Sequence, residues 1–337
     1  MYRVVVNSTE DLQKVLSIND MEYADIYLST RSCTIVNYSS AMLGLMKLSL
    51  KKNDGYAIQF RMERKLLEKL AVEGYIDFTI NDTTITAEFV TQEGRKLYDI
   101  TFAKQNVYAL EYQNEIEILK EVEKSPDCWC SLEPLSRLAT VARSSNCVLT
   151  VENKVACVQI TDHMKLWADL EGFNIPNMSV QVGALLKLLK LNLSVFNYKN
   201  FVGTVRGNVT LMCKKVRGFN VADFKLAREQ KSALKCKIDL SELTTILAKL
   251  TISDKIVTIN LSDDGSNGFV SLTIGHSRIN VPIGISEFRK ADTYAVEPIE
   301  MPMFLLKTIL TKTKPTFFLS KKRSFIELEQ DNLVVMF

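Results

Sequence analysis

A short amphipathic helix pattern returns six times along the 337 residues, and this repeat constrains the fold more than any other feature. Self-similarity at a roughly fixed spacing indicates one structural unit used repeatedly. The six stretches are residues 8–18, 61–72, 131–143, 179–191, 239–252 and 301–314. The segments between them are typical of strands, so the sequence predicts a small helix-plus-sheet unit repeated six times.

The helix predictions rest on apolar spacing and on capping residues. In residues 239–252, Leu240, Leu243 and Leu247 follow the i, i+3, i+7 rule of a buried helix face. Ser131 and Asp239 stand where N-caps are expected. Helices of about three turns are too short to be stable alone, so each must pack its apolar stripe on a sheet.

Alternating apolar residues predict hairpins at 75–90, 256–274 and 317–328. Single helices separated by antiparallel strands indicate an α+β protein with helices on one face of the sheets. Pairing the six units gives three tandem domains, at 1–125, 126–232 and 233–337. The acidic stretch 113–126 is expected to be the first connector and 224–232 the second.

Composition excludes several classes of protein. Hydrophobic content of 47%, charged content of 24% and a net charge of +3 are typical of a soluble globular chain. We expect no signal peptide and no membrane span. The seven cysteines have no framework spacing, which favours reduced thiols and a cytoplasmic location.

Three segments resemble the bacterial β sliding clamp family, the rings that tether a DNA polymerase to its template. Residues 161–166, Thr-Asp-His-Met-Lys-Leu, are similar to the family's Thr-Asp-Gly-His-Arg-Leu. Residues 218–224, Gly-Phe-Asn-Val-Ala-Asp-Phe, resemble Gly-x-Phe-Pro-Asp-Tyr, and 333–337, Leu-Val-Val-Met-Phe, resemble the family's closing Val-Val-Met-Pro-Met-x-Leu. The first domain matches in layout alone. Every motif departs from the family pattern, which indicates a divergent member compatible with a phage or plasmid origin.

The resemblance implies two subunits closing head to tail into a ring, with twelve helices lining a hole for double-stranded DNA. It implies a DNA polymerase, a clamp loader and a second copy of the chain as partners, a nucleoid-associated location, and neither cofactor nor membrane. It also implies a groove that binds partner peptides between the second and third domains. The residues that correspond to this groove are Thr161, Lys165, Leu166, Val334, Met336 and Phe337. The alternative for the last strand is that it simply completes the core.

The charge distribution agrees with DNA inside a ring. The six predicted helices carry a net charge of +6, so the remainder of the chain carries −3. Dispersed cations can follow phosphates without reading bases, although such charges are also typical of ordinary solvated helix faces. The residues expected to contact DNA are Arg61, Arg64, Lys65, Lys69, Arg137, Lys187, Lys190, Lys307 and Lys312.

No motif indicates an enzyme. The two histidines, His163 and His276, lack a metal or catalytic spacing, and Cys128-Trp-Cys130 is a lone C-x-C. A non-catalytic sliding clamp is therefore the predicted function. The main alternative is a monomeric processivity factor or DNA-binding scaffold that grips DNA without encircling it, and a structural protein without a DNA role comes third.

Overall fold

The fold was obtained as a computed structural model. It describes residues 2–8, 11–17, 22–53, 55, 57–70, 74–107, 111–142, 146–160, 165–219, 221, 233–249, 256–274, 276–303, 306, 315–319, 325–328 and 333–336. The chain divides into two compact units, one from Met1–Glu133 with Ala184–Val216, the other from Pro134–Gly183 with Arg217–Phe337. The three-domain boundaries stay a prediction.

The elements repeat the order β–α–β–β–β. The first repeat is β1 (Tyr2–Ser8), α1 (Asp11–Leu16), β2 (Tyr23–Leu28), β3 (Ser32–Tyr38) and β4 (Met42–Asn53). The second is β5 (Ile58–Glu63), α2 (Arg64–Leu70), β6 (Gly74–Ile80), β7 (Thr84–Val90) and β8 (Lys96–Ala103). The third is β9 (Trp129–Ser131), α4 (Glu133–Ala142), β10 (Val148–Glu152), β11 (Val155–Gln159) and β12 (Lys165–Asp169).

The second half of the chain follows the same order. The fourth repeat is β13 (Met178–Gln181), α5 (Val182–Leu191), β14 (Ser194–Tyr198), β15 (Phe201–Arg206) and β16 (Val209–Lys214). The fifth is β17 (Leu234–Asp239), α7 (Ser241–Lys249), β18 (Ile256–Leu261), β19 (Gly268–Ile274) and β20 (Ser277–Pro282). The sixth is β22 (Ile299–Pro302), β23 (Thr316–Leu319), β24 (Phe325–Leu328) and β25 (Leu333–Met336). Of its predicted helix, Met303 and Leu306 are described as helical.

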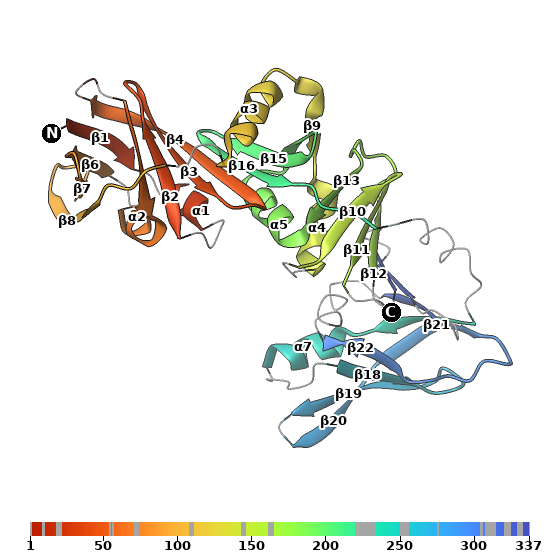
Figure 1. The fold of residues 1–337 in the computed structure, drawn as a ribbon. Coiled ribbons are helices and arrows are strands. Elements are labelled where there is room, and N and C mark those ends of the chain that lie inside the picture. Colours follow the sequence, from red (N-terminus) through yellow and green to blue (C-terminus); the bar gives the residue numbers. More distant parts are fainter. Residues whose placement is uncertain are drawn as a thin grey trace. The chain divides into compact units, whose positions relative to one another are not determined.

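The first unit is built on a twelve-stranded sheet with the path β8-β7-β6-β1-β4-β16-β15-β14-β9, and β2, β3 and β5 branch from it beside β4 (Figure 1). The β4–β16 ladder runs from Met42 opposite Cys213 to Met46 opposite Val209. This ladder joins strands of the first repeat to strands of the fourth, which are far apart in sequence.

The second unit contains a nine-stranded sheet with the path β13-β10-β11-β12-β25-β24-β23-β17-β21 and a four-stranded sheet with the path β20-β19-β18-β22. Strand β21 (Gly284–Lys290) stands outside the repeat and pairs with β17. The predicted hairpins are confirmed, since β6 pairs with β7, β18 with β19 and β23 with β24. The α+β class with antiparallel sheets is therefore confirmed.

The predicted helices begin two or three residues too early, because in the second to fifth repeats a strand ends within one residue of the helix start. Residues 61–63 belong to β5, where Met62 is buried, and 179–181 belong to β13. The expected caps lie just before the true starts. Ser131 Oγ accepts the Glu133 N–H at 3.4 Å, and Asp239 Oδ1 accepts the Ser241 N–H at 3.1 Å. Helix signals extend into these stretches because a buried strand end and a first helical turn both tolerate apolar residues.

The predicted first connector contains a helix, which its acidic composition did not indicate. Residues Gln113–Val122 form helix α3, which precedes a short 3-10 turn at Pro126–Cys128. Adjacent residues of β3 show which face α3 covers. Val36 belongs to the apolar cluster beneath α3, whereas the Asn37 amide donates to the carbonyls of Val15 and Leu16 at the end of α1. Helices α1 and α3 therefore lie on opposite faces of the sheet, because neighbouring strand residues point in opposite directions.

Candidate DNA-facing helices and partner-binding strands

Arg61 lies on strand β5 and not on a helix as predicted. Its Nε donates to Asp25 Oδ1 at 2.6 Å and its Nη2 donates to Asp25 Oδ2 at 3.0 Å. Asp25 is buried, and the Tyr112 hydroxyl also donates to it at 2.9 Å. The hydrogen bond with Asp25 raises the pKa of the Arg61 guanidinium. This arrangement gives the buried carboxylate of Asp25 its hydrogen bonds and its counter-charge. The positive charge of Arg61 is therefore neutralised within the protein.

Helix α2 presents the predicted cations in two different ways. Arg64, its first residue, ion-pairs with Glu68 at 3.0 Å and donates to the Leu16 carbonyl at 3.1 Å. Lys65 and Lys69 are exposed and lie four residues apart, which places them on the same side of the helix. Leu67, which lies between them in the sequence, is fully buried and packs the opposite side of α2 against the core. Lys65 and Lys69 are thus the α2 cations available to an external anion.

Helix α5 carries the second described basic pair. Its buried stripe is Val182, Leu185 and Leu188, whereas Leu186 and Leu189 are only half-buried. Lys187 is half-buried and Lys190 is exposed in the last turn. A lysine in the last turn is also favoured by the negative end of the helix dipole. Both helices therefore carry their lysines away from the fully buried stripe.

The remaining predicted DNA contacts have less structural support. Arg137 lies on α4, but its side chain is outside the described part of the structure. Lys307 and Lys312 lie outside the described residues altogether. Of the repeat helices with defined bounds, α2 and α5 each carry a net charge of +2, and α1, α4 and α7 are neutral. Helix α3, which stands outside the repeat, carries −2. Helix α3 thus places negative charge on the face of the sheet opposite α1.

The two segments predicted to form the peptide groove are adjacent in the structure. Strand β12 pairs with β25, so that Lys165 lies opposite Met336, and Leu166 lies opposite Val335. Val334 lies opposite Trp167 in the same ladder. Leu166 is fully buried, and its side chain therefore contributes to the core beneath this ladder. Thr161 and Phe337 lie outside the described residues.

The segment around Gly218 packs beside these strands. A Cβ at Gly218 would lie 2.3 Å from Ser179 Oγ and 3.0 Å from Thr150 Oγ1, so a larger residue would not fit there. The apolar residues that follow, Phe219 and Val221, pack in one cluster with the buried Trp167 of β12. This close approach explains the glycine of the motif at 218–224, of which residues 220 and 222–224 are outside the described part.

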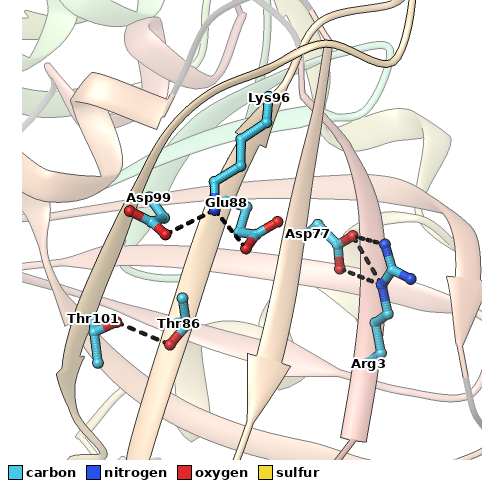
Figure 2. Close-up of polar contacts among 7 residues, drawn as sticks. All are labelled: Arg3, Asp77, Thr86, Glu88, Lys96, Asp99 and Thr101. Atoms are coloured by element: carbon cyan, nitrogen blue, oxygen red, sulfur yellow. Dashed lines mark hydrogen bonds and ion pairs between the residues drawn. The ribbon is translucent and has the colours of Figure 1, made fainter.

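Strand β8 ends the path of the twelve-stranded sheet, and its side chains alternate between exposed and half-buried. Figure 2 shows the polar face beside this edge, where Lys96 Nζ lies 2.9 Å from Glu88 and 2.8 Å from Asp99, and Arg3 pairs with Asp77. Glu88 stands opposite both Asp77 and Asp99 in the ladders, so these cations offset the repulsion of a row of carboxylates.

The histidines and cysteines show no metal-binding group within the described part of the chain. His276 is exposed in a turn, and no group of three His, Cys, Asp or Glu residues could hold a metal there. His163 is outside the described residues. Burial raises the pKa of the Cys130 thiol to about 11, and all seven cysteines are free. None of the described helices is long and apolar enough to cross a membrane.

Repeated β–α–β–β–β units with antiparallel sheets define the architecture of a DNA clamp, and solved clamp structures match the whole chain. A protein described as a DNA polymerase III beta subunit, from Eubacterium rectale, matches with a TM-score of 0.72 at 10% identity, covering 100% of this chain and 98% of that one. A DNA polymerase sliding clamp from Pseudomonas aeruginosa matches with a TM-score of 0.69 at 11% identity, covering 100% and 98%. The sliding clamp from Bacillus subtilis matches with a TM-score of 0.69 at 10% identity, covering 99% and 98%.

The chain therefore has the fold of the bacterial sliding clamps, as the resemblance predicted. No family model matches the chain, and no curated protein matches its sequence. The likeness is carried by the arrangement of elements, because only about one residue in ten is shared with the solved structures.

Proposed function

We propose that this protein is a non-catalytic DNA sliding clamp, in which two copies close a ring around duplex DNA and tether a polymerase to it. The observation that carries the proposal is the match to sliding clamps over the full chain. The charge of the helices supports it. Repeat helices α2 and α5 are basic and α1, α4 and α7 are neutral, whereas α3, which lies outside the repeat, is acidic.

The proposed DNA contacts are made by lysines that can reach phosphate without reading bases. Lys65, Lys69 and Lys190 are exposed on their helices, and Lys187 is half-buried. Phosphate contacts supply affinity without sequence preference, which is what movement along DNA requires. Arg137, Lys307 and Lys312 remain proposed contacts. Arg61 and Arg64 are not among the proposed contacts, because their guanidinium groups form ion pairs within the protein.

Ring closure is proposed to join the edge of β8 to the edge of β20 in a second copy. On β8, the apolar residues Tyr98, Ile100 and Phe102 are only half-buried in one chain. On β20, Ile279 is likewise half-buried beside the buried Val281. A sheet edge with partly exposed apolar residues is a liability that pairing with another strand removes.

The backbone of both edges allows their polar faces to align. Lys104 N donates to Thr83 O, so Asp99 and Thr101 point their backbone groups away from β7 and toward the free edge. Ile283 N donates to Gly268 O, so Arg278 and Asn280 likewise point away from β19. An antiparallel junction that places Asp99 opposite Asn280 brings Arg278 to a diagonal position, within reach of the Asp99 carboxylate. Pro282, which has no N–H, then falls opposite Leu97 next to the irregularity in β8.

Polymerase and clamp-loader peptides are proposed to dock beside the β12–β25 ladder. The ladder unites the two segments that resemble the family's groove, and Phe219 and Val221 pack against Trp167 of β12. Thr161, Lys165, Leu166, Val334, Met336 and Phe337 remain the proposed groove residues. Leu166 would then act from the core by supporting the groove floor, because its own side chain is fully buried.

Retention on circular DNA tests the proposal directly. A ring loaded on a circular duplex should remain bound in high salt and should leave when the circle is cut, whereas surface binding weakens equally on both forms. Sedimentation at micromolar concentration should give twice the 38.2 kDa mass of one chain. A single 38.2 kDa species with equal retention on linear and circular DNA would instead favour the monomeric processivity factor.

A further inference from the structure

Helix α3 lies across the line where two distant parts of the first unit meet. Among the strands that the structure describes, the β4–β16 ladder is the one pairing between β1–β8 and the strands β9 and β14–β16. In Figure 1, α3 lies on one side of β15 and β16, and α5 lies on the other. We call the β4–β16 ladder the seam.

The apolar face of α3 packs on both sides of this seam. Ile118 and Val122 are buried in a single cluster together with Tyr112, the residue before the helix. On one side the cluster includes Val36, Leu43 and Leu45 of β3 and β4. On the other side it includes Phe196, Phe201 and Met212 of β14, β15 and β16. One helix thus covers a continuous apolar surface contributed by both parts.

Polar contacts fasten α3 to each part separately. On the β16 side, the buried Glu115 pairs with Lys214 at 3.1 Å, and Glu121 pairs with Lys199 at 2.6 Å. On the other side, the Tyr112 hydroxyl donates to Asp25 of β2 at 2.9 Å and also contacts the Tyr27 hydroxyl. Breaking the buried Glu115 pair would leave a charge without water or a partner, which is costly.

We propose that α3 is a clasp that holds the β4–β16 seam closed, so that the two parts it bridges move as one block. Separating β4 from β16 would require α3 to leave at least one side of its cluster and expose apolar side chains to water. The clasp therefore couples the opening of the seam to its own release. This inference rests on contacts within one chain and holds whether or not two copies form a ring.

Amide hydrogen exchange on the full chain tests the clasp. The variant Ile118→Asp places a carboxylate in the apolar cluster, and the matched control Lys120→Asp places the same group on the exposed side of the same helix. The amides that donate across the seam are those of residues 43, 45 and 47 on β4 and of residues 210, 212 and 214 on β16. We expect them to exchange about tenfold faster in Ile118→Asp than in the control, equivalent to about 1.4 kcal/mol. Amides of the β6–β7 ladder, which contributes no residue to the cluster, should stay within about twofold.

Two outcomes would contradict the proposal that α3 holds the seam closed. In one, α3 amides exchange rapidly in Ile118→Asp while the seam keeps its protection, which would mean that the seam closes without the helix. In the other, β6–β7 amides accelerate as much as seam amides, which would mean that α3 adds only global stability. If Ile118→Asp does not fold, Tyr112→Phe removes one hydroxyl from the anchor. A folded Tyr112→Phe chain with seam exchange at the parental rate would also refute the proposal.

Discussion

Arg61 lies directly opposite Asp25 across the β2–β5 ladder, and its guanidinium binds both oxygens of that buried carboxylate. Tyr112 brings the start of α3 to the same carboxylate. Arg61, which was predicted to contact DNA, therefore has a structural role. It neutralises the carboxylate to which Tyr112 holds the start of the first connector.

This pairing predicts a stability defect for Arg61→Met. Removing the guanidinium leaves the Asp25 carboxylate buried without its cation, and the free energy of unfolding should fall by about 3 kcal/mol. Urea denaturation measures this change. The double variant Asp25→Asn with Arg61→Met should recover part of the loss because the buried charge is gone. An Arg61→Met protein of unchanged stability and weaker DNA retention would restore Arg61 to the DNA contacts.

Charge reversal on α2 should weaken DNA binding without changing the fold. Lys65→Glu with Lys69→Glu reverses two exposed charges, whereas the buried Leu67 still packs. Each phosphate that is no longer neutralised should reduce the salt slope by about 0.9, so two phosphates reduce it by about 1.8. Salt-dependent retention on circular DNA measures the slope. Lys120→Glu on α3 serves as the control and should leave the slope unchanged, because α3 lies on the face of the sheet opposite α1, the helix that contacts α2.

The proposed strand junction between copies predicts an effect of charge exchange. Asp99→Arg alone should raise the dimer dissociation constant, because the new cation would face Arg278 of the second copy. Combining it with Arg278→Asp should restore much of the affinity by recreating an opposite pair. Analytical ultracentrifugation of the single and double variants separates the outcomes. If neither the single nor the double variant changes the dimer affinity, this strand register is excluded, whereas the clamp proposal still stands.

Removing Met336 and Phe337 should weaken partner binding. Met336 pairs with Lys165 at the end of the β12–β25 ladder, where the proposed groove begins. If the two residues are anchor points that together supply about 1.4 kcal/mol or more, peptide affinity falls about tenfold or more. Titration calorimetry with a polymerase-tail peptide measures this. Dimer mass and helix content should not change, and full-strength binding by the shortened protein would place the docking site elsewhere.

The Glu115–Lys214 pair predicts a stability change in alkaline solution. The hydrogen bond with Glu115 raises the pKa of Lys214 above the ordinary value of 10.5. A raised lysine pKa contributes stability that is fully present below the unfolded value and is lost as pH rises through the folded value. The difference in unfolding free energy between the parental protein and Glu115→Gln should therefore be constant from pH 7 to about 9.5 and shrink above about 10.5. A difference that grows above pH 10.5 would show that the pair is not formed.

Much of the fold was predictable because the helices and strands of each repeat have recognisable local patterns of apolar residues. The periodicity at 239–252 locates α7, and alternation at 75–90 locates the β6–β7 hairpin. The first residue of each helix was not predictable, because the last residues of the preceding strand fit the helical period as well as the strand period. Helix α3 was not predicted, because an acidic residue such as Glu115 is expected to be exposed to solvent. Its ion-pair partner Lys214 is distant in the chain and has no local signal. The spacing of apolar residues across 116–122 was the signal that could have revealed it.

The candidate surfaces were predictable to a lesser extent. Exposed lysines on α2 and α5 follow from helical periodicity, so Lys65, Lys69 and Lys190 lie where the pattern places them. Ladder registers between distant strands have no local signal. The Asp25–Arg61 pair depends on such a register, and the β12–β25 pairing came from the resemblance of two short motifs.

The β4–β16 ladder also dictates an order of events during protein synthesis. Strand β4 emerges from the ribosome early, but β16 is translated only after the third repeat and most of the fourth. Until then β4 has a bare edge flanked by apolar residues such as Leu43 and Met46, which is the kind of edge that recruits other nascent chains. Helix α3 is translated in between and can shield one face of β4, but it cannot satisfy that edge. Folding of the amino-terminal part is therefore completed late, and slow translation before β16 would favour aggregation.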